Sequence, residues 1–134
     1  MNAPAPVFGS TSETEKMNEL GDEYYYGRNG KRQDYAEAVR WYRKAAELGC
    51  GYGQCNMGIC CEWGNGVKED CAEAARWYRK GAEQDLPVAQ YFLANLYRDG
   101  KGVPYDVEEA IRWYRKAAAL GDEDAAKELD RLIG

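Results

Sequence analysis

The sequence predicts an all-α solenoid, because one pattern recurs along the chain at a fixed period. The tetrapeptide Trp-Tyr-Arg-Lys begins at Trp41, Trp77 and Trp113, 36 residues apart each time. A fixed period of this length is typical of repeat proteins, in which each unit buries its apolar side against its neighbours. Helix starts, apolar stripes and glycine-rich turns recur with it. Together they predict seven helices in about 3.5 helix-turn-helix repeats.

The second helix of each repeat is predicted to begin at an aspartate. Asp34, Asp70 and Asp106 each precede a glutamate by three residues. This spacing indicates a capping box, in which the aspartate accepts from a first-turn amide and the glutamate reaches back to the aspartate amide. Because the carboxylate pair recurs at every helix start, we interpret it as capping rather than catalysis.

An apolar stripe of helical period follows each of these starts. In the first copy it consists of Ala38, Trp41, Tyr42, Ala45 and Leu48. The recurrence of the Trp-Tyr pairs in such stripes predicts that they form the core. Gly49 and Gly121 follow the stripes as C-cap glycines, whereas Asp85 stands in the middle copy, so we expect a less regular helix end there.

The first helix of each repeat is predicted near residues 16–24, 53–61 and 89–97. Glycine-rich turns at 64–67 and 100–103 supply the positive φ angles that a sharp reversal needs. The loop of the first copy, residues 27–33, is one residue longer and lacks the apolar residue that would pack on the core. Residues 122–133 repeat the spacing of a first helix alone and are predicted to be a capping helix.

The predicted domain spans 13–134, with repeats at about 15–50, 51–86 and 87–122 and the capping helix at 122–134. Residues 1–12 contain Pro, Ala, Ser and Thr without the basic and apolar regions of a signal peptide. They are predicted to be a disordered leader.

Composition excludes several partner classes. The net charge is −5, whereas nucleic-acid binding needs a concentrated positive surface. We therefore expect no nucleic-acid partner and interpret the periodic Arg-Lys pairs as a solvated face. The sequence contains no run of 18 apolar residues, so no membrane span is predicted. A cytoplasmic location is expected.

Enzymatic chemistry has little support in the sequence. The chain has no histidine, the commonest general base. No glycine-rich phosphate loop follows a strand, since Gly64 and Gly66 lie in a turn between helices. We predict a protein that is not an enzyme, with no catalytic residues and no cofactor.

The five cysteines are confined to one stretch and leave three interpretations open. They are Cys50, Cys55, Cys60, Cys61 and Cys71. We favour reduced, buried thiols that act as small apolar side chains. A disulfide between Cys61 and Cys71 is the second interpretation. A metal site is the third, although paired Cys-x-x-Cys motifs and histidine are missing.

These motifs resemble the Sel1-like repeats, a branch of the tetratricopeptide-like helical repeats. The family pattern is approximately Ala-x-x-x-Leu-Gly-x-x-Tyr, Gly-x-Gly-Val, Asp-x-x-x-Ala-x-x-Trp-Tyr-x-Lys-Ala-Ala and a closing Gly. Residues 89–121 match it nearly throughout, whereas the middle copy has Gly53 and Cys61, and the first has Lys16 and an altered loop. The resemblance implies a right-handed superhelix that acts as an adaptor, binding a peptide or partner protein in its concave groove in bacterial-type signalling or assembly.

The resemblance also implies alternatives. Some secreted relatives carry a disulfide in every repeat and are linked to cell-wall compounds, but the cysteines of this chain do not recur. A secreted or periplasmic protein that binds a small molecule or cell-wall compound is therefore an alternative, if a signal peptide was removed. A structural module that forms a weak homodimer, rather than a monomer, is another.

In tetratricopeptide-like arrays, the first helix of each repeat lines the concave face, which implies a set of partner-binding residues. We call it the predicted row: Asn18, Asp22, Tyr25, Cys55, Ile59, Glu62, Tyr91, Asn95, Arg98, Lys127 and Arg131. Tyr25, Tyr91 and Arg98 are expected to contribute most, because interface hot spots favour tyrosine and arginine.

Two aromatic features lie outside this pattern. Trp63 is expected either to fill the junction between repeats, which we favour, or to be exposed as an interface anchor. Tyr24, Tyr25 and Tyr26 are consecutive, so they cannot all face the core of a helical protein, and at least one should be exposed.

Overall fold

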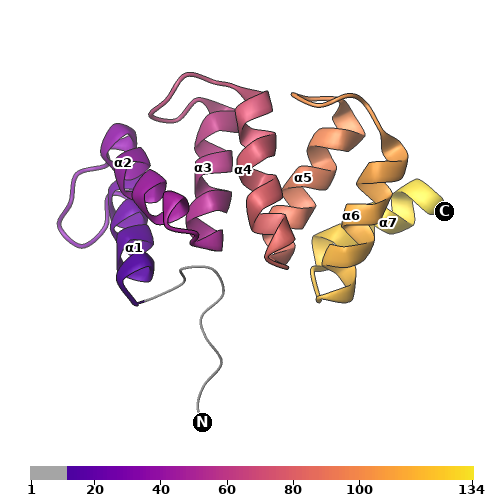
Figure 1. Ribbon diagram of the computed structural model, residues 1–134, viewed down its shortest axis with the longest axis horizontal. Coiled ribbons are helices and arrows are strands. Elements are labelled where there is room, and N and C mark those ends of the chain that lie inside the picture. The colour runs from indigo at the N-terminus through magenta and orange to yellow at the C-terminus, as the bar shows by residue number, and fades with distance from the viewer. Residues whose placement is uncertain (1–11) are drawn as a thin grey trace, which may run out of the picture.

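The computed structural model describes residues 12–134, which form an array of seven helices and no strand (Figure 1). The helices are α1 (Ser12–Tyr26), α2 (Tyr35–Glu47), α3 (Gly51–Trp63), α4 (Cys71–Glu83), α5 (Pro87–Asp99), α6 (Val107–Ala119) and α7 (Glu123–Ile133). This is the predicted all-α solenoid. The predicted leader lies outside the described residues, except for Ser12, which begins α1.

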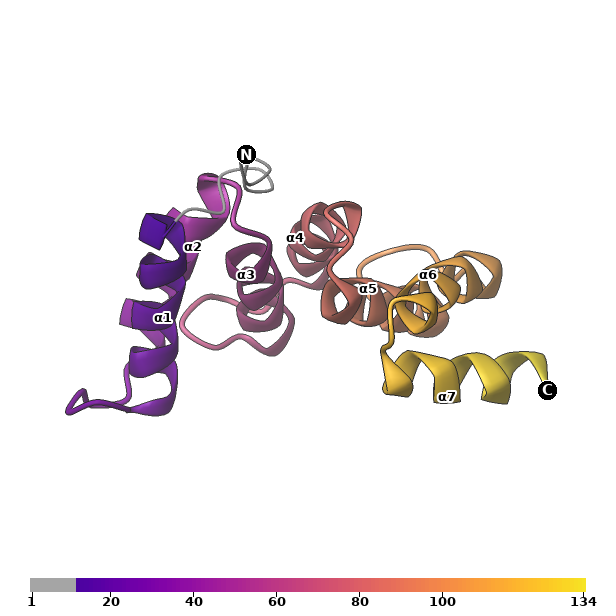
Figure 2. The ribbon, with the colours of Figure 1, turned by 90° about the horizontal axis from the view of Figure 1, so that it is seen from below.

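Each helix packs mainly against the helices that precede and follow it in the chain. The odd-numbered helices lie along one side of the array and the even-numbered helices along the other (Figure 2). The array arches so that α1 and α7, at its two ends, lie on its inner side. We call the side formed by the odd-numbered helices the inner face, because it is where the predicted row lies.

The aspartate caps are confirmed, but the reciprocal half of the capping box is wrong. Asp34 Oδ1 accepts a hydrogen bond from the Glu37 amide at 3.0 Å, and the other two copies repeat this geometry. The amide of Asp34, however, donates to the carbonyl of Tyr24 at 2.8 Å. Since the equivalent amides also bind the preceding helix, the glutamates are released to pair with arginines three residues later.

The Trp-Tyr pairs form the core, as predicted. Tyr78 and Tyr114 have no exposed surface, and Trp77 and Trp113 are 8% exposed. Trp41 is only half-buried. The ring of Trp113 is covered by the preceding repeat, since the guanidinium carbon of Arg79 lies 6.0 Å from its centroid. Trp41 belongs to the first described repeat, so no preceding repeat among the described residues covers its ring.

The end of α4 at Asp85 keeps the turn of its equivalents and is less regular in one hydrogen bond. Asp85 adopts a left-handed conformation with φ of 60°, as Gly49 does with φ of 95°. The amide of Leu86 then bonds back to Gly81, as that of Cys50 does to Ala45. Aspartate tolerates this backbone region better than most residues, so α4 keeps the same turn. The amide of Gln84, however, lacks the bond to Lys80 that matches those of Leu48 to Lys44 and Leu120 to Lys116, so this helix end is less regular, as expected.

The loop of the first repeat differs from the others in the expected way. Val67 and Val103 pack against the core in the later loops. Lys31 stands at their position, forms a 2.8 Å ion pair with Glu23, and lies over the ring of Tyr24. An ion pair at the surface therefore replaces an apolar contact in this repeat.

Candidate functional site

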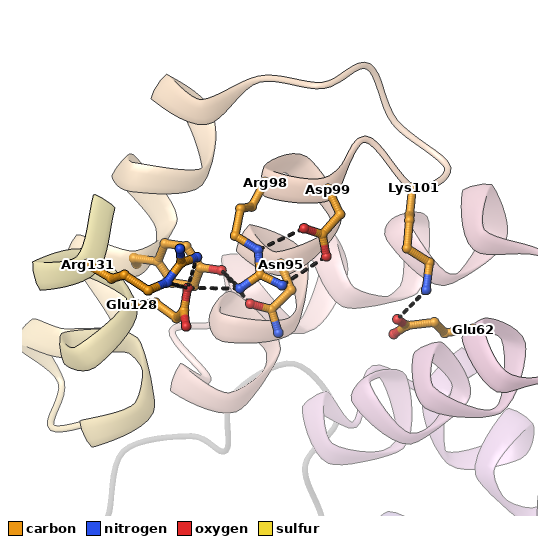
Figure 3. Close-up of polar contacts among 8 residues, drawn as sticks. Glu62, Asn95, Arg98, Asp99, Lys101, Glu128 and Arg131 are labelled. Carbon is orange, nitrogen blue, oxygen red and sulfur yellow. Dashed lines mark hydrogen bonds and ion pairs between the residues drawn. The ribbon is translucent and has the colours of Figure 1, made fainter. Parts of the chain in front are cut away.

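The last position of the predicted row in each repeat binds the repeat that follows. The hydroxyl of Tyr25 accepts a 2.8 Å hydrogen bond from Asn65 Nδ2, in the loop of the second repeat. Glu62 Oε2 lies 3.4 Å from Lys101 Nζ, in the loop of the third repeat (Figure 3). Two predicted binding residues of the same position therefore join consecutive repeats.

Arg98 occupies this position in the third repeat and binds α7. Its guanidinium donates to Glu128 Oε1 at 2.9 Å and to Tyr114, and it forms an ion pair with Asp99 (Figure 3). Glu128 also accepts from Arg131 at 2.8 Å. The bonds from Arg131 and Arg98 lower the pKa of the Glu128 carboxyl. Arg98, a predicted hot spot, is thus already engaged in holding the last helix.

The middle position of the row binds the buried tyrosines of the outer helices. Asp22 Oδ1 accepts from the Tyr42 hydroxyl at 2.5 Å, and Asn95 Oδ1 accepts from Tyr114. The second repeat has Ile59 here, and Glu62 accepts from the Tyr78 hydroxyl at 2.8 Å instead.

The three bound tyrosines resist ionisation. Burial raises the pKa of Tyr42, Tyr78 and Tyr114 above the usual range, and the nearby carboxylates Asp22 and Glu62 add to this effect for the first two. A buried hydroxyl without a partner is costly. The polar residues of the row therefore contribute to folding as well as to the surface.

The first position of the row differs most between repeats. Asn18 accepts a 2.8 Å hydrogen bond from Asn56, which joins α1 to α3. Tyr91 is half-buried, with its ring centroid 6.0 Å from that of Tyr114. Cys55 is only 3% exposed and belongs to the core, because Gly53 and Gly58 let α3 approach α2 and α4 closely. We therefore remove Cys55 from the row.

The remaining members, which we call the inner row, differ in charge between the two ends of the array. Lys127 and Arg131 of α7 are exposed at one end, and the acidic side chain of Asp22 lies at the other. A cavity of about 330 Å³ beside Asp22 is lined by Glu19, Glu23, Arg28 and Asn29. Within the inner row, the acidic groups thus lie toward α1 and the basic groups toward α7.

All five cysteines are free thiols. Burial raises the pKa of Cys55 and of Cys60 to about 12. Cys71 is partly exposed, whereas the other four are buried. Among residues 12–134, no group of three His, Cys, Asp or Glu side chains is placed to hold a metal ion.

The favoured interpretation of Trp63 is wrong, since its side chain is 65% exposed. Lys101 of the next repeat lies over the indole, 5.3 Å from the ring centroid, so the junction is bridged by the lysine rather than filled by the ring.

Tyr26 is 55% exposed and Tyr24 and Tyr25 are half-buried, which confirms that the three tyrosines do not all face the core. Tyr105, 70% exposed, is an aromatic that the sequence analysis did not single out.

Within the described part of the chain, no helix combines the length and the apolar character that spanning a membrane requires.

The Sel1 repeat family model matches three segments, residues 17–50, 51–86 and 87–122. Among solved structures, the chain is 41% identical to a protective antigen of uropathogenic Escherichia coli that displays an SLR fold, with a TM-score of 0.84 over 87% of this chain and 25% of that one. A Sel1 repeat protein from Oxalobacter formigenes is 35% identical, with a TM-score of 0.82 over 90% of this chain and 51% of that one.

Cysteine-rich protein B of Helicobacter pylori is 26% identical, with a TM-score of 0.70 over 90% of this chain and 99% of that one. No curated protein matches. The chain thus spans a quarter of the E. coli protein and half of the Oxalobacter protein. With three matched repeats covering most of its length, the chain belongs to the Sel1 repeat family.

Proposed function

We propose that this protein is a non-enzymatic adaptor that binds an extended peptide or a partner protein along the inner row. Sel1 repeat proteins generally act as protein–protein interaction modules. The inner row of this chain is the surface on which we expect that general role to be exercised.

One observation carries the proposal: the polar side chains of the inner row are held in place before any partner arrives. Asp22, Glu62 and Asn95 each accept a hydrogen bond from a buried tyrosine hydroxyl. Fixing a side chain in advance reduces the conformational entropy that binding would otherwise cost. A row of fixed donors and acceptors with acid at one end and base at the other also selects the direction of a bound segment.

The test must avoid residues that hold the array together. Arg98→Glu would place a carboxylate against Asp99 and Glu128 and would release α7, so loss of binding in that variant would be uninformative. Lys127→Glu combined with Tyr91→Ala changes the inner row at an exposed and a half-buried position. The matched control is Arg115→Glu combined with Tyr105→Ala, which makes the same charge reversal and the same tyrosine truncation at two exposed positions on α6 and on the loop that precedes it.

We expect the wild type and the control pair to retain a protein from native lysate that the inner-row pair loses, with equal helicity by circular dichroism. Retention by all three would contradict the inner row as the binding surface. A mass that rises with concentration, measured by light scattering without any other protein bound, would favour the homodimer instead. Binding of cell-wall fragments alone would favour the small-ligand alternative.

A further inference from the structure

The first helix of each later repeat has one face that packs on the helix before it. In α3 this face contains Gln54 and, three and seven residues later, Met57 and Cys61, all of which are buried. Gln54 Nε2 donates a hydrogen bond to the carbonyl of Ala46 in α2 at 3.2 Å. The equivalent residue of α5, Gln90, donates in the same way to a carbonyl of α4 at 3.1 Å. Both junctions between described repeats therefore use this face.

α1 carries the equivalent face, but no helix packs on it within residues 12–134, because α1 begins the array (Figure 1). Gly21 and Gly58 mark the same position in α1 and α3, since a Cβ added at either would collide with a buried tyrosine ring of the next helix. This alignment places Met17, Leu20 and Tyr24 at the positions of the three buried residues of α3. All three are only partly buried. They form an apolar stripe along α1 that no described helix covers.

Lys16 indicates that this face is not built to receive the helix of another repeat. The residues at its position in α3 and α5 are Gly53 and Ala89. A Cβ added at Gly53 would lie only 2.9 Å from Ala45 Cβ of α2, and one added at Gly81 of α4 would lie 3.0 Å from Ala89 Cβ. A lysine side chain does not fit so close a contact between helices, and its charge is costly to bury without a partner. A ligand that covers this face must therefore leave room for Lys16 and offer it a carboxylate.

The charges on this face are arranged so that it complements a copy of itself. Lys16 and Glu23 are seven residues apart and share one edge of the stripe, and Met17 and Tyr24 share the other edge, with Leu20 between them. At about 1.5 Å per residue, Lys16 lies about 6 Å before the level of Leu20 and Glu23 about 4.5 Å after it. A two-fold axis at Leu20, perpendicular to α1, therefore brings Lys16 of one copy to Glu23 of the other, and Met17 to Tyr24. We call the following residues the α1 face: Lys16, Met17, Leu20, Glu23 and Tyr24.

Glu23 remains able to bind this lysine. Its carboxylate accepts from Lys31 Nζ at 2.8 Å and from Asn29 Nδ2 at 2.7 Å, one on each oxygen. A carboxylate has about four acceptor sites, so each oxygen can take another donor. The Glu23 side chain is also partly exposed. Antiparallel pairing of two copies therefore gives an apolar centre with an ion pair of Lys16 and Glu23 at each end.

We propose that the α1 face binds the α1 face of a second copy of this chain, with the two α1 helices antiparallel. The contact is isologous, because both copies contribute the same residues about a two-fold axis. Asn18 and Asp22, the inner-row residues at this level of α1, lie two residues to either side of Leu20 and thus on the opposite side of the helix. The dimer therefore leaves both inner rows open and can hold a partner at two points. This inference goes beyond the proposed adaptor function, which depends on the inner row.

The first test is the mass of the full chain, measured by sedimentation equilibrium over a wide range of concentrations. We expect the mass to rise from that of one chain to that of two. Leu20→Glu should raise the dissociation constant at least about tenfold, because it places two carboxylates together at the centre of the contact. The matched control, Leu120→Glu, makes the same change at an exposed position at the end of α6 and should leave the constant unchanged. Circular dichroism should show equal helicity in all three proteins.

The charges allow a second test, which depends on how the two helices are aligned. Lys16→Glu and Glu23→Lys should each weaken self-association, because each variant brings like charges together in its own dimer. Mixed in equal amounts, the two variants should pair with each other, since both contacts then join a carboxylate to an amine. Light scattering of the mixture and of each variant alone, at equal total concentration, measures this. A mixture that associates no more tightly than either variant alone, with helicity equal to the wild type, would overturn the proposal.

A wild-type chain that stays monomeric at every concentration would also overturn it, as would a dimer that Leu20→Glu leaves intact. A variant lacking residues 1–11 that dimerises while the full chain does not would assign the α1 face to that segment instead. The inner-row pair Lys127→Glu/Tyr91→Ala should still dimerise, and Leu20→Glu should still retain the partner from lysate. The dimer and the adaptor function can therefore fail independently.

Discussion

At the residue scale, the same side chains that look available for binding also satisfy the core. Tyr78 has no exposed surface, yet its hydroxyl reaches Glu62 on the inner face. The sequence pattern predicts that Tyr78 is buried but does not say where its hydroxyl finds an acceptor. In the first and third repeats the acceptors are Asp22 and Asn95, at the middle position of the row. The second repeat has Ile59 at that position, and Glu62 is the acceptor there instead. Such a substitution becomes visible only when the helices are placed side by side.

The buried tryptophans differ in one hydrogen bond, which permits a controlled comparison. Trp113 Nε1 donates to Glu109 Oε2 at 3.0 Å, whereas Trp77 Nε1 is buried without a partner. Replacing either ring by Phe removes similar volume, so Trp113→Phe should cost about 1 kcal/mol more than Trp77→Phe. Trp77→Ala should cost about 3–5 kcal/mol, because it leaves a cavity. Urea unfolding followed by circular dichroism measures all three, and equal costs for the two Phe variants would show that the Glu109 bond contributes nothing.

Thiol reactivity should separate Cys71 from the other four cysteines. Cys71 is partly exposed, and the rest are buried, with raised pKa values for Cys55, Cys60 and Cys61. Because the thiolate is the reactive form, Ellman's reagent at pH 8 should show one fast thiol in the native protein and five in urea. Cys71→Ser should remove the fast phase alone. Three thiols in urea would contradict this and support the Cys61–Cys71 disulfide.

At the element scale, α7 packs less extensively on its neighbour than the other described helices do. Ala125 is its one fully buried residue. Arg98 and Arg131 both bind Glu128, and this group compensates with charge for what α7 lacks in apolar burial. The sequence predicts a capping helix with polar outer positions, but it assigns Arg98 and Arg131 to a partner rather than to α7.

Glu128→Ala should loosen α7 selectively. The pair of Arg98 and Glu128 is largely shielded, with side chains 24% and 23% exposed, so the expected cost is about 1 kcal/mol. Hydrogen exchange of the α7 amides should quicken while α3 stays unchanged, and Lys127→Ala should have no such effect. Unaltered exchange in α7 would contradict the assignment.

The pH dependence of this contribution has a definite sign. The pKa of Glu128 is lowered in the folded protein, first by its bond to Arg131 and then by its bond to Arg98. The stabilisation is therefore present above the unfolded pKa, about 4.3, and is lost as the pH falls through the lower, folded value.

Close helix packing explains why glycine recurs within the first helices. A Cβ added at Gly58 would lie 2.4 Å from the ring of Tyr78, and one at Gly21 would lie 2.5 Å from Tyr42. Gly58→Ala should therefore destabilise the protein by about 1–3 kcal/mol through overpacking. Ala94 stands at the same position in the third repeat, where Ala94→Gly should cost about 1 kcal/mol through helix propensity. A stabilising effect of Gly58→Ala in urea unfolding would mean that the Tyr78 ring moves aside freely.

At the scale of the whole molecule, the fold was predictable because the same sequence pattern occurs three times. The Trp-Tyr stripe, the aspartate caps and the glycine turns each recur at 36 residues, so errors in one copy are corrected by the others. The binding surface was less predictable, because it depends on contacts between repeats. Glu62 with Lys101 and Tyr25 with Asn65 use different residues at each junction, and no periodic signal identifies them. Likewise, the contact of Trp63 with Lys101 joins residues of different repeats, so the spacing within one repeat does not predict it.

The buried cysteine and tyrosine side chains predict that the folded array loses stability at alkaline pH. Burial raises the pKa of Cys55 and Cys60 to about 12 and holds the pKa of Tyr78 above its usual range. In the unfolded chain these groups ionise near pH 8.5 for cysteine and 10 for tyrosine. The folded state binds their protons more tightly, so the stability they contribute is complete below pH 8.5 and is lost as pH rises toward the folded values.

Each such group should steepen the decline by about 1.4 kcal/mol per pH unit once its unfolded form ionises. Urea unfolding between pH 7 and 11 should show constant stability to about pH 8.5 and a progressive loss beyond it, steepest above pH 10. Tyr78→Phe should lower stability at pH 7, because Glu62 loses its donor, and flatten the decline above pH 10. Tyr105→Phe, at a 70% exposed position, should change neither. A free energy of unfolding that stays constant to pH 11 would contradict this prediction. It would mean that these groups ionise in the folded protein as readily as in the unfolded chain.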